Sequence, residues 1–112
     1  ISEVEIGVDI EMIREKISIV AHKFSQSELN FLDNKEGIDY IKKLTVIWGC
    51  KESIFKIQNE PGISFKDHID VFPFELNEKK TNAILNFNQL NLEFELGFEE
   101  ISDYMLVYAT KK

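Results

Sequence analysis

The order of its periodic segments most constrains the fold of this 112-residue chain. Alternating apolar residues open the chain, one long helix-periodic segment follows, and further alternating segments complete it. Apolar residues at every second position predict strands, whereas steps of three, four and seven predict a helix. Because the links between the later strands are short, they favour antiparallel hairpins. We therefore expect an α+β fold, an antiparallel sheet with helices packed on one face.

The central helix is predicted to run from about Ile38 to Gln58. Its apolar face is formed by Ile41, Leu44, Trp48 and Phe55. The sequence "NEPG" ends it because Pro61 cannot continue a helix. Gly49 is a weak position inside this helix, at a cost of about 1 kcal/mol relative to alanine.

Shorter elements are expected on both sides of this helix. Residues 12–24 show helical spacing, Ser25 and Glu28 form a capping-box pattern, and "DNKEG" reads as a loop. Four strands are predicted after the helix, at about residues 69–74, 83–87, 90–98 and 104–109.

Composition limits the class of protein. With 44% hydrophobic residues the chain has enough apolar side chains for one core, and no apolar run reaches the length of a membrane span. A net charge of −7 argues against nucleic acid as a partner. The single Cys50 cannot form an internal disulfide, so we expect a cytoplasmic protein.

The first strand contains "GVDIE". Its alternation predicts that the apolar set Val4, Ile6, Val8 and Ile10 is buried, which puts Asp9 and Glu11 together on the opposite face. Two carboxylates at neighbouring positions of one face repel each other. Solvation explains the pair, and a nearby positive group explains it better.

Two interpretations of Glu52 and Lys56 remain open at this point. Glutamate followed by lysine four residues later is a common stabilising pair on a helix. Alternatively, Glu52 joins Asp9 and Glu11 in an oxygen-lined site for a divalent cation such as Mg²⁺. The spacing alone does not show that the three carboxylates converge.

The motifs "GVDIE", "FSQSE" and "WGCKESIFK", in this order, resemble those of the 4′-phosphopantetheinyl transferases of the surfactin-synthetase-activating type. The resemblance covers residues 6–64 well and the later strands only in general character. Ser53 stands where alanine is more common in the family.

The resemblance implies transfer of 4′-phosphopantetheine from coenzyme A to a serine of an acyl or peptidyl carrier protein, with release of 3′,5′-ADP. It implies that Asp9, Glu11 and Glu52 hold Mg²⁺ against the pyrophosphate. Lys56 would neutralise or protonate the leaving phosphate, and Lys51 would contact phosphate oxygens or help to order the site. Glu52 or a metal-bound water would accept the serine proton.

The resemblance is to the second of two similar lobes. We expect residues 1–112 to be a single lobe, the C-terminal half of a two-lobe protein, because the chain lacks an initiator Met and the Ser-His-Ser stretch of the first lobe. The alternative is self-association, as in the small trimeric form of the family. A non-catalytic lobe that docks a carrier protein or a sister lobe is the alternative function.

Other polar residues have simpler explanations. Glu28 matches an acid near the family's site and is equally the capping partner of Ser25. His22 and His68 have no metal-ligand spacing and are expected at or near the surface. Cys50 has no base near it in sequence, so we do not expect it to be a nucleophile.

Overall fold

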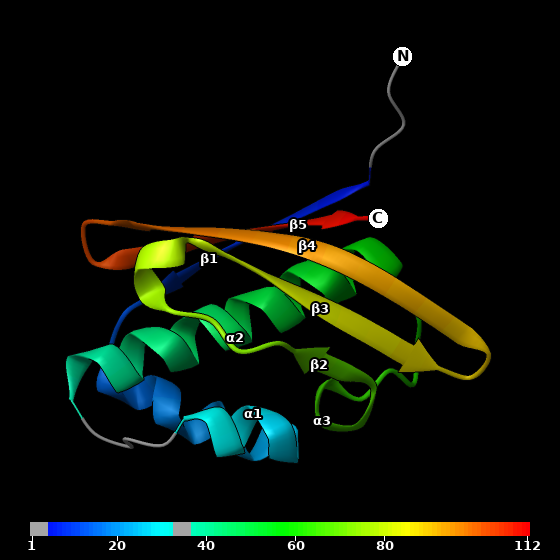
Figure 1. Cartoon of the computed structure of the whole chain (residues 1–112), viewed down its shortest axis with the longest axis horizontal. Coiled ribbons are helices and arrows are strands. Elements are labelled where there is room, and N and C mark those ends of the chain that lie inside the picture. The colour runs from blue at the N-terminus through cyan, green and yellow to red at the C-terminus, as the bar shows by residue number, and fades with distance from the viewer. Residues whose placement is uncertain (1–4, 33–36) are drawn as a thin grey trace.

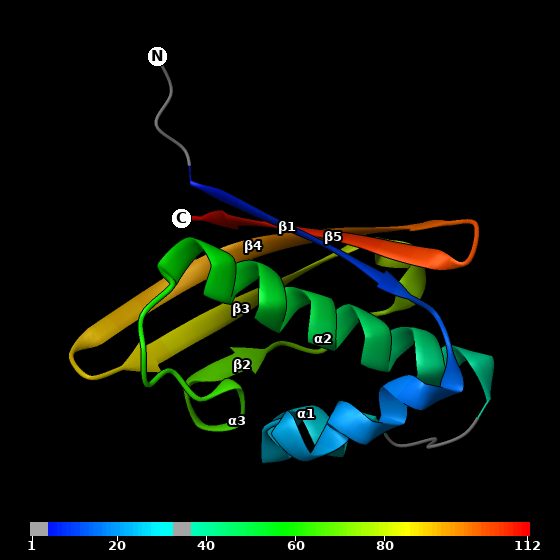
Figure 2. The same cartoon turned by 180° about the vertical axis from the view of Figure 1, so that it is seen from behind.

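A computed structural model describes residues 5–32 and 37–112. One antiparallel sheet forms one layer, and the helices form a second layer on one of its faces (Figures 1 and 2). The expected α+β fold is therefore confirmed. The predicted "DNKEG" loop lies mostly outside the described residues.

The sheet has the strand order β1-β5-β4-β3-β2, so β1 and β2 are its edges. The strands are β1 (Ile6–Met12), β2 (Ile69–Val71), β3 (Lys80–Phe87), β4 (Leu90–Ile101) and β5 (Tyr104–Lys111). Strand β1 pairs with β5, the last strand of the chain, in the register Asp9↔Val107. Asp9, in the first strand, thus lies beside the last strand of the chain.

The longest helix, α2 (Ile38–Gln58), has the predicted bounds. It crosses the sheet mainly over β1 and β5 (Figure 2). Ile41 and Leu44 of its predicted apolar face are buried, while Trp48 and Phe55 are half-buried. The helix ends at Asn59, which has a left-handed backbone and donates its N–H to the Phe55 carbonyl.

Short helical segments complete the helical layer: η1 (Glu15–Lys23), α1 (Gln26–Phe31), α3 (Phe65–His68) and η2 (Leu76–Glu78). The helix expected over residues 12–24 is a 3₁₀ helix, and Met12 belongs to β1. The predicted capping box is confirmed, since Ser25 Oγ accepts from the Glu28 N–H and the Glu28 carboxylate accepts from the Ser25 N–H.

Strand β1 presents the opposite faces from those predicted. Asp9 is buried and Glu11 half-buried on the face toward α2, whereas Ile6, Val8 and Ile10 are exposed on the outer face. The physical reason is that β1 passes close to α2 at Gly7, so Asp9 and Glu11, two and four positions further on, face the helix too. The fourth residue of the expected apolar set, Val4, lies outside the described residues.

Candidate functional site

Small residues bring α2 against the two strands that carry the site. A Cβ at Gly7 would lie 2.1 Å from the Ser53 carbonyl oxygen, and one at Gly49 would lie 2.6 Å from Val107 Cγ2. Ser53 Oγ also donates a hydrogen bond of 3.3 Å to the Val107 carbonyl. The glycine that looked like a weak position in the helix is therefore required by close packing.

Asp9 lies at this contact, and its two carboxylate oxygens have different surroundings. Its side chain is 9% exposed. Oδ1 accepts a hydrogen bond of 3.0 Å from Lys56 Nζ, whereas Oδ2 is buried and has no hydrogen-bond partner. A buried carboxylate oxygen without a partner is costly, because its lost hydration is not replaced. Oδ2 is thus a free acceptor aimed into the protein beside Gly49.

Glu11 and Glu52 are electrostatic neighbours of Asp9. Burial, together with the proximity of the carboxylates of Asp9 and Glu52, raises the pKa of Glu11 to about 8. Burial and then the charge of Asp9 raise the pKa of Glu52 as well. Both shifts have the sign expected of carboxylates that lack a sufficient positive charge nearby.

These three carboxylates fit a hard divalent cation in their chemistry. Their oxygens are the ligands that Mg²⁺ prefers, and it commonly takes only one or two protein carboxylates. The free Asp9 Oδ2 supplies an unused ligand atom. Within residues 5–32 and 37–112, however, no three His, Cys, Asp or Glu side chains are arranged as ligands of one ion. The carboxylates are therefore neighbours and not a preformed cage.

Lys56 does not pair with the glutamate four residues before it. Its Nζ donates to Asp9 Oδ1 at 3.0 Å and to the Val8 carbonyl at 2.8 Å. Among the ion pairs of the described residues, none joins Lys56 to Glu52. The simple helix-surface pair is therefore wrong for this side chain, which instead connects the end of α2 to β1.

Lys51 points away from these groups into the core. The Lys51 side chain is fully buried, and its Nζ donates to the carbonyls of Phe65 and Ile69, both at 2.6 Å, and to Glu28 at 2.9 Å. The second Glu28 oxygen accepts from the Val71 N–H at 2.6 Å. Burial raises the pKa of Glu28 and lowers that of Lys51, while each charge opposes the shift of the other. Glu28 is thus both the capping partner of Ser25 and the ion-pair partner of Lys51.

Trp48 lies between two shallow hollows that adjoin the carboxylates. One hollow, of about 260 Å³, includes Glu11 and Arg14 in its lining, and the other, of about 410 Å³, includes Glu52 and Lys23. Lys23 Nζ lies 5.5 Å from the centroid of the Trp48 ring. Arg14 and Lys23 were not predicted from the sequence, because neither belongs to the motifs that carry the family resemblance.

The sequence predicted no catalytic role for Cys50, His22 and His68, and their positions in the structure agree with that prediction. Cys50 is fully buried, and burial raises the pKa of its thiol, which opposes a nucleophilic role. His22 is exposed and contacts the Ile19 carbonyl. His68 is half-buried and accepts the Ser64 N–H through Nδ1 at 2.7 Å.

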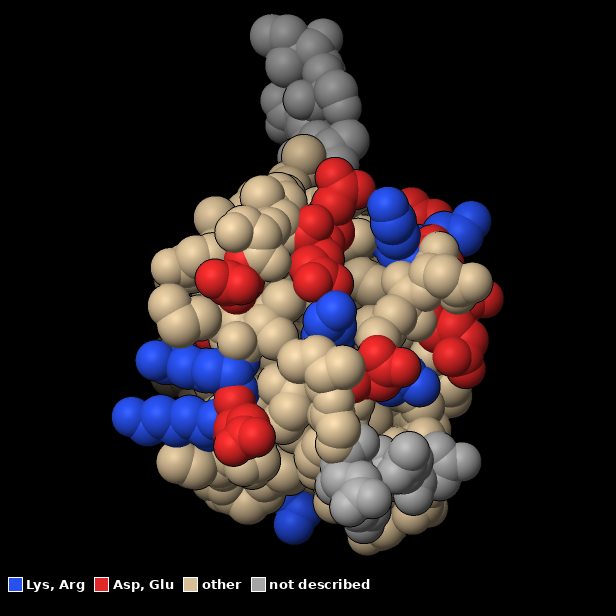
Figure 3. All heavy atoms as spheres, turned by 90° about the vertical axis from the view of Figure 1, so that its left-hand side faces the viewer, with Lys and Arg blue, Asp and Glu red and all other residues tan. Residues whose placement is uncertain are grey.

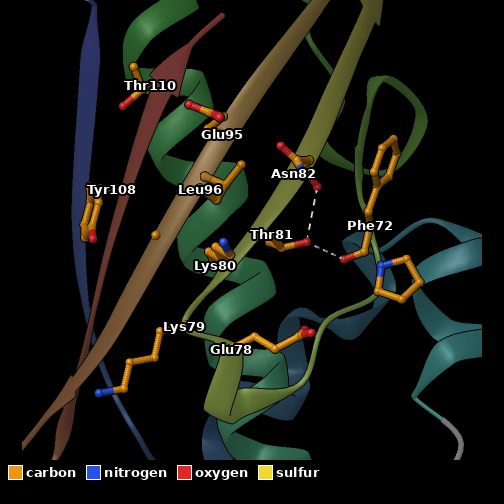
Figure 4. Close-up of a pocket in the computed structure, with 12 residues that line it drawn as sticks. Phe72, Glu78, Lys79, Lys80, Thr81, Asn82, Glu95, Leu96, Tyr108 and Thr110 are labelled. Carbon is orange, nitrogen blue, oxygen red and sulfur yellow. Dashed lines mark hydrogen bonds between the residues drawn. The ribbon is translucent and has the colours of Figure 1, made fainter.

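A larger hollow, of about 740 Å³, lies elsewhere, over β3, β4 and β5 (Figure 4). Its lining mixes acidic and basic side chains, including Glu78, Lys79 and Glu95, and contains none of the site residues. Figure 3 likewise shows positive and negative side chains interspersed over one face, with no continuous basic surface there. In the part of the chain that the structure describes, no helix has the length and hydropathy of a membrane span.

Comparisons with known proteins identify the fold and the family of this chain. The fold matches the structure of an acyl carrier protein synthase (AcpS) of Mycobacterium tuberculosis with a TM-score of 0.66 and 13% identity, over 97% of both chains. No curated protein matches this sequence. The family model of the 4′-phosphopantetheinyl transferase superfamily matches residues 5–109. The chain therefore belongs to the 4′-phosphopantetheinyl transferase superfamily and is an enzyme that transfers phosphopantetheine to carrier proteins.

Proposed function

We propose that this enzyme transfers 4′-phosphopantetheine from coenzyme A to a serine of an acyl or peptidyl carrier protein in a Mg²⁺-dependent reaction. The observation that carries the proposal is the free, buried Asp9 Oδ2, with two further carboxylates as electrostatic neighbours. Asp9, Glu11 and Glu52 would hold Mg²⁺, which when bound neutralises charge on the pyrophosphate.

In the reaction, the serine hydroxyl oxygen bonds to the phosphorus that carries pantetheine. The bond from this phosphorus to the bridging oxygen breaks, and 3′,5′-ADP leaves with the electron pair. Glu52, half-buried beside Asp9, would accept the serine proton. Lys56, with a half-exposed side chain, would stabilise the negative charge on the departing phosphate.

Lys51 has the role of ordering the site. Of the two roles expected for it, contact with a phosphate would require its ammonium to leave three oxygens of the protein interior. Its burial with Glu28 instead supports a structural connection between α1, α2 and the segment from α3 to β2. This connection holds α2 in place one residue before Glu52.

We further propose that the site functions next to a second lobe or a second copy of the chain. The exposed apolar face of β1 supports this pairing, because a monomer rarely leaves such a strip uncovered. The single buried Cys50 suits a cytoplasmic location.

The decisive test is Asp9→Asn, which keeps the shape of the side chain but removes its charge. With coenzyme A, Mg²⁺ and an apo carrier protein, the variant should lose activity by orders of magnitude while keeping its circular dichroism spectrum. Transfer is measured as the mass gained by the carrier serine. Asp103→Asn, in the exposed turn before β5, is the matched control and should keep full activity. Wild-type turnover by Asp9→Asn would refute the proposed metal site.

A further inference from the structure

Lys56 lies on the carboxylate that the proposed metal site needs. Its Nζ is 3.0 Å from Asp9 Oδ1 and 2.8 Å from the Val8 carbonyl oxygen. An ammonium at this distance is already a cation bound to Asp9. A divalent ion that bound the free Oδ2 of the same carboxylate would face this positive charge at close range in a partly buried position, where like charges repel strongly.

We propose that Lys56 is an internal cation that a divalent metal displaces from Asp9, and that this exchange releases the Lys56 ammonium toward the phosphates of the substrate. The inference rests on the proposed function, because it takes Asp9 as a metal ligand. It adds an order of events: the metal binds first, and the lysine becomes available to phosphate as a result.

The two lysines of the motif differ in their freedom to move. Lys51 is fully buried and held by three protein oxygens, so its displacement would leave buried acceptors without partners. The Lys56 side chain is 49% exposed and holds Asp9 from the last turn of α2. Its flexible stem allows the ammonium to leave Asp9 for solvent at low cost. Only Lys56 therefore suits an exchange.

A nearby lysine separates displacement from a general effect of charge. Lys23 lies close enough to lower the pKa of Glu52, yet its ammonium lies over Trp48 and makes no hydrogen bond or ion pair with Asp9 in the described residues. Removing Lys23 deletes one positive charge beside the carboxylates but leaves the hydrogen bond of Asp9 intact. Removing Lys56 deletes a positive charge and also removes the hydrogen bond to Asp9 Oδ1.

The first experiment measures Mn²⁺ binding to the full-length protein by electron paramagnetic resonance, without coenzyme A. We expect Lys56→Met to bind Mn²⁺ about tenfold more tightly than the wild type, because the competing cation is gone. Lys23→Met should bind within about threefold of the wild type, since its charge is solvent-screened. Circular dichroism confirms that each variant is folded.

The second experiment measures the position of the ammonium directly. Acetylation of Lys56 by a lysine-specific reagent, followed by mass spectrometry, should become several-fold faster when Mg²⁺ is added. Lys42, which pairs with Glu100 and not with a carboxylate of the site, serves as the internal reference and should react at an unchanged rate.

The outcomes are distinguishable. If the wild type binds Mn²⁺ and Lys56→Met binds it no better, or if Lys23→Met gains as much as Lys56→Met, the exchange is refuted while the metal site stands. An acetylation rate of Lys56 that is unchanged or lower with Mg²⁺ also refutes it. If neither wild type nor variant binds Mn²⁺, the proposed metal site fails and the exchange fails with it.

Discussion

Charge at single residues decides how the site behaves. Asp9, Glu11 and Glu52 repel one another. Among the described residues, Lys56 is the only cation in an ion pair with one of them, Asp9, while Lys23 acts on Glu52 from farther away. Burial and the neighbouring carboxylates of Asp9 and Glu52 outweigh the charge of Lys56, so Glu11 keeps its proton to an unusually high pH. A further cation would therefore stabilise this group of carboxylates. Perturbed pKa values of this kind are typical of binding and catalytic sites.

The raised pKa of Glu11 predicts a pH dependence of stability in the presence of EDTA. The pKa of Glu11 is about 8 in the folded protein and 4.5 ordinarily, so the folded state binds more protons than the unfolded state between these pH values. The free energy of unfolding should therefore fall as pH rises from about 4.5 to about 8 and then level off. Glu11→Gln should lose this component. Urea unfolding at several pH values measures it, and parallel curves for both proteins would contradict the assignment.

At the scale of elements, the site depends on how closely α2 approaches β1 and β5. Gly49→Ala tests this. Alanine favours a helix by about 1 kcal/mol, but its Cβ would lie 2.6 Å from Val107 Cγ2. We expect a net loss of stability of about 1–3 kcal/mol from overpacking. Urea unfolding measures this loss.

The partner substitution is the control for that prediction. Val107→Ala removes the clashing methyl group, so the double variant should lose less stability than the two single losses combined. Additive losses would show that the clash with Val107 is not the cause.

Sequence periodicity predicts those helices and caps that are decided by residues close together in the sequence. The bounds of α2 and the Ser25 capping box follow from residues a few positions apart, and both agree with the structure. The Asp9–Lys56 contact joins residues 47 positions apart, so no local pattern contains it. The prediction of which face of β1 is buried was wrong for a similar reason. Alternation gives two faces of a strand, and only the packing partner decides which one is covered.

At the scale of the whole molecule, the apolar side chains of β1 form part of an exposed apolar strip on the outer face of the sheet. The strip joins neighbouring strands through the pairs Val8↔Tyr108 and Met12↔Tyr104. Its exposed members are Ile6, Val8, Ile10, Met12, Ile101, Tyr104 and Tyr108. The same strand thus faces α2 with its acids and solvent with its apolar side chains. This division makes sense when a partner covers the outer face.

Ile10→Lys tests whether a partner covers this strip. Ile10 is 62% exposed in the single chain, so lysine there should cost little stability in the monomer but should prevent apolar contact across the outer face. We expect the 112-residue chain to self-associate and the variant to be monomeric, as measured by light scattering after size-exclusion chromatography. Ile38→Lys is the matched control, because Ile38 is 59% exposed at the start of α2, away from the sheet face, and should leave association unchanged. A monomeric wild type that binds coenzyme A at micromolar concentration would contradict the need for a covered outer face.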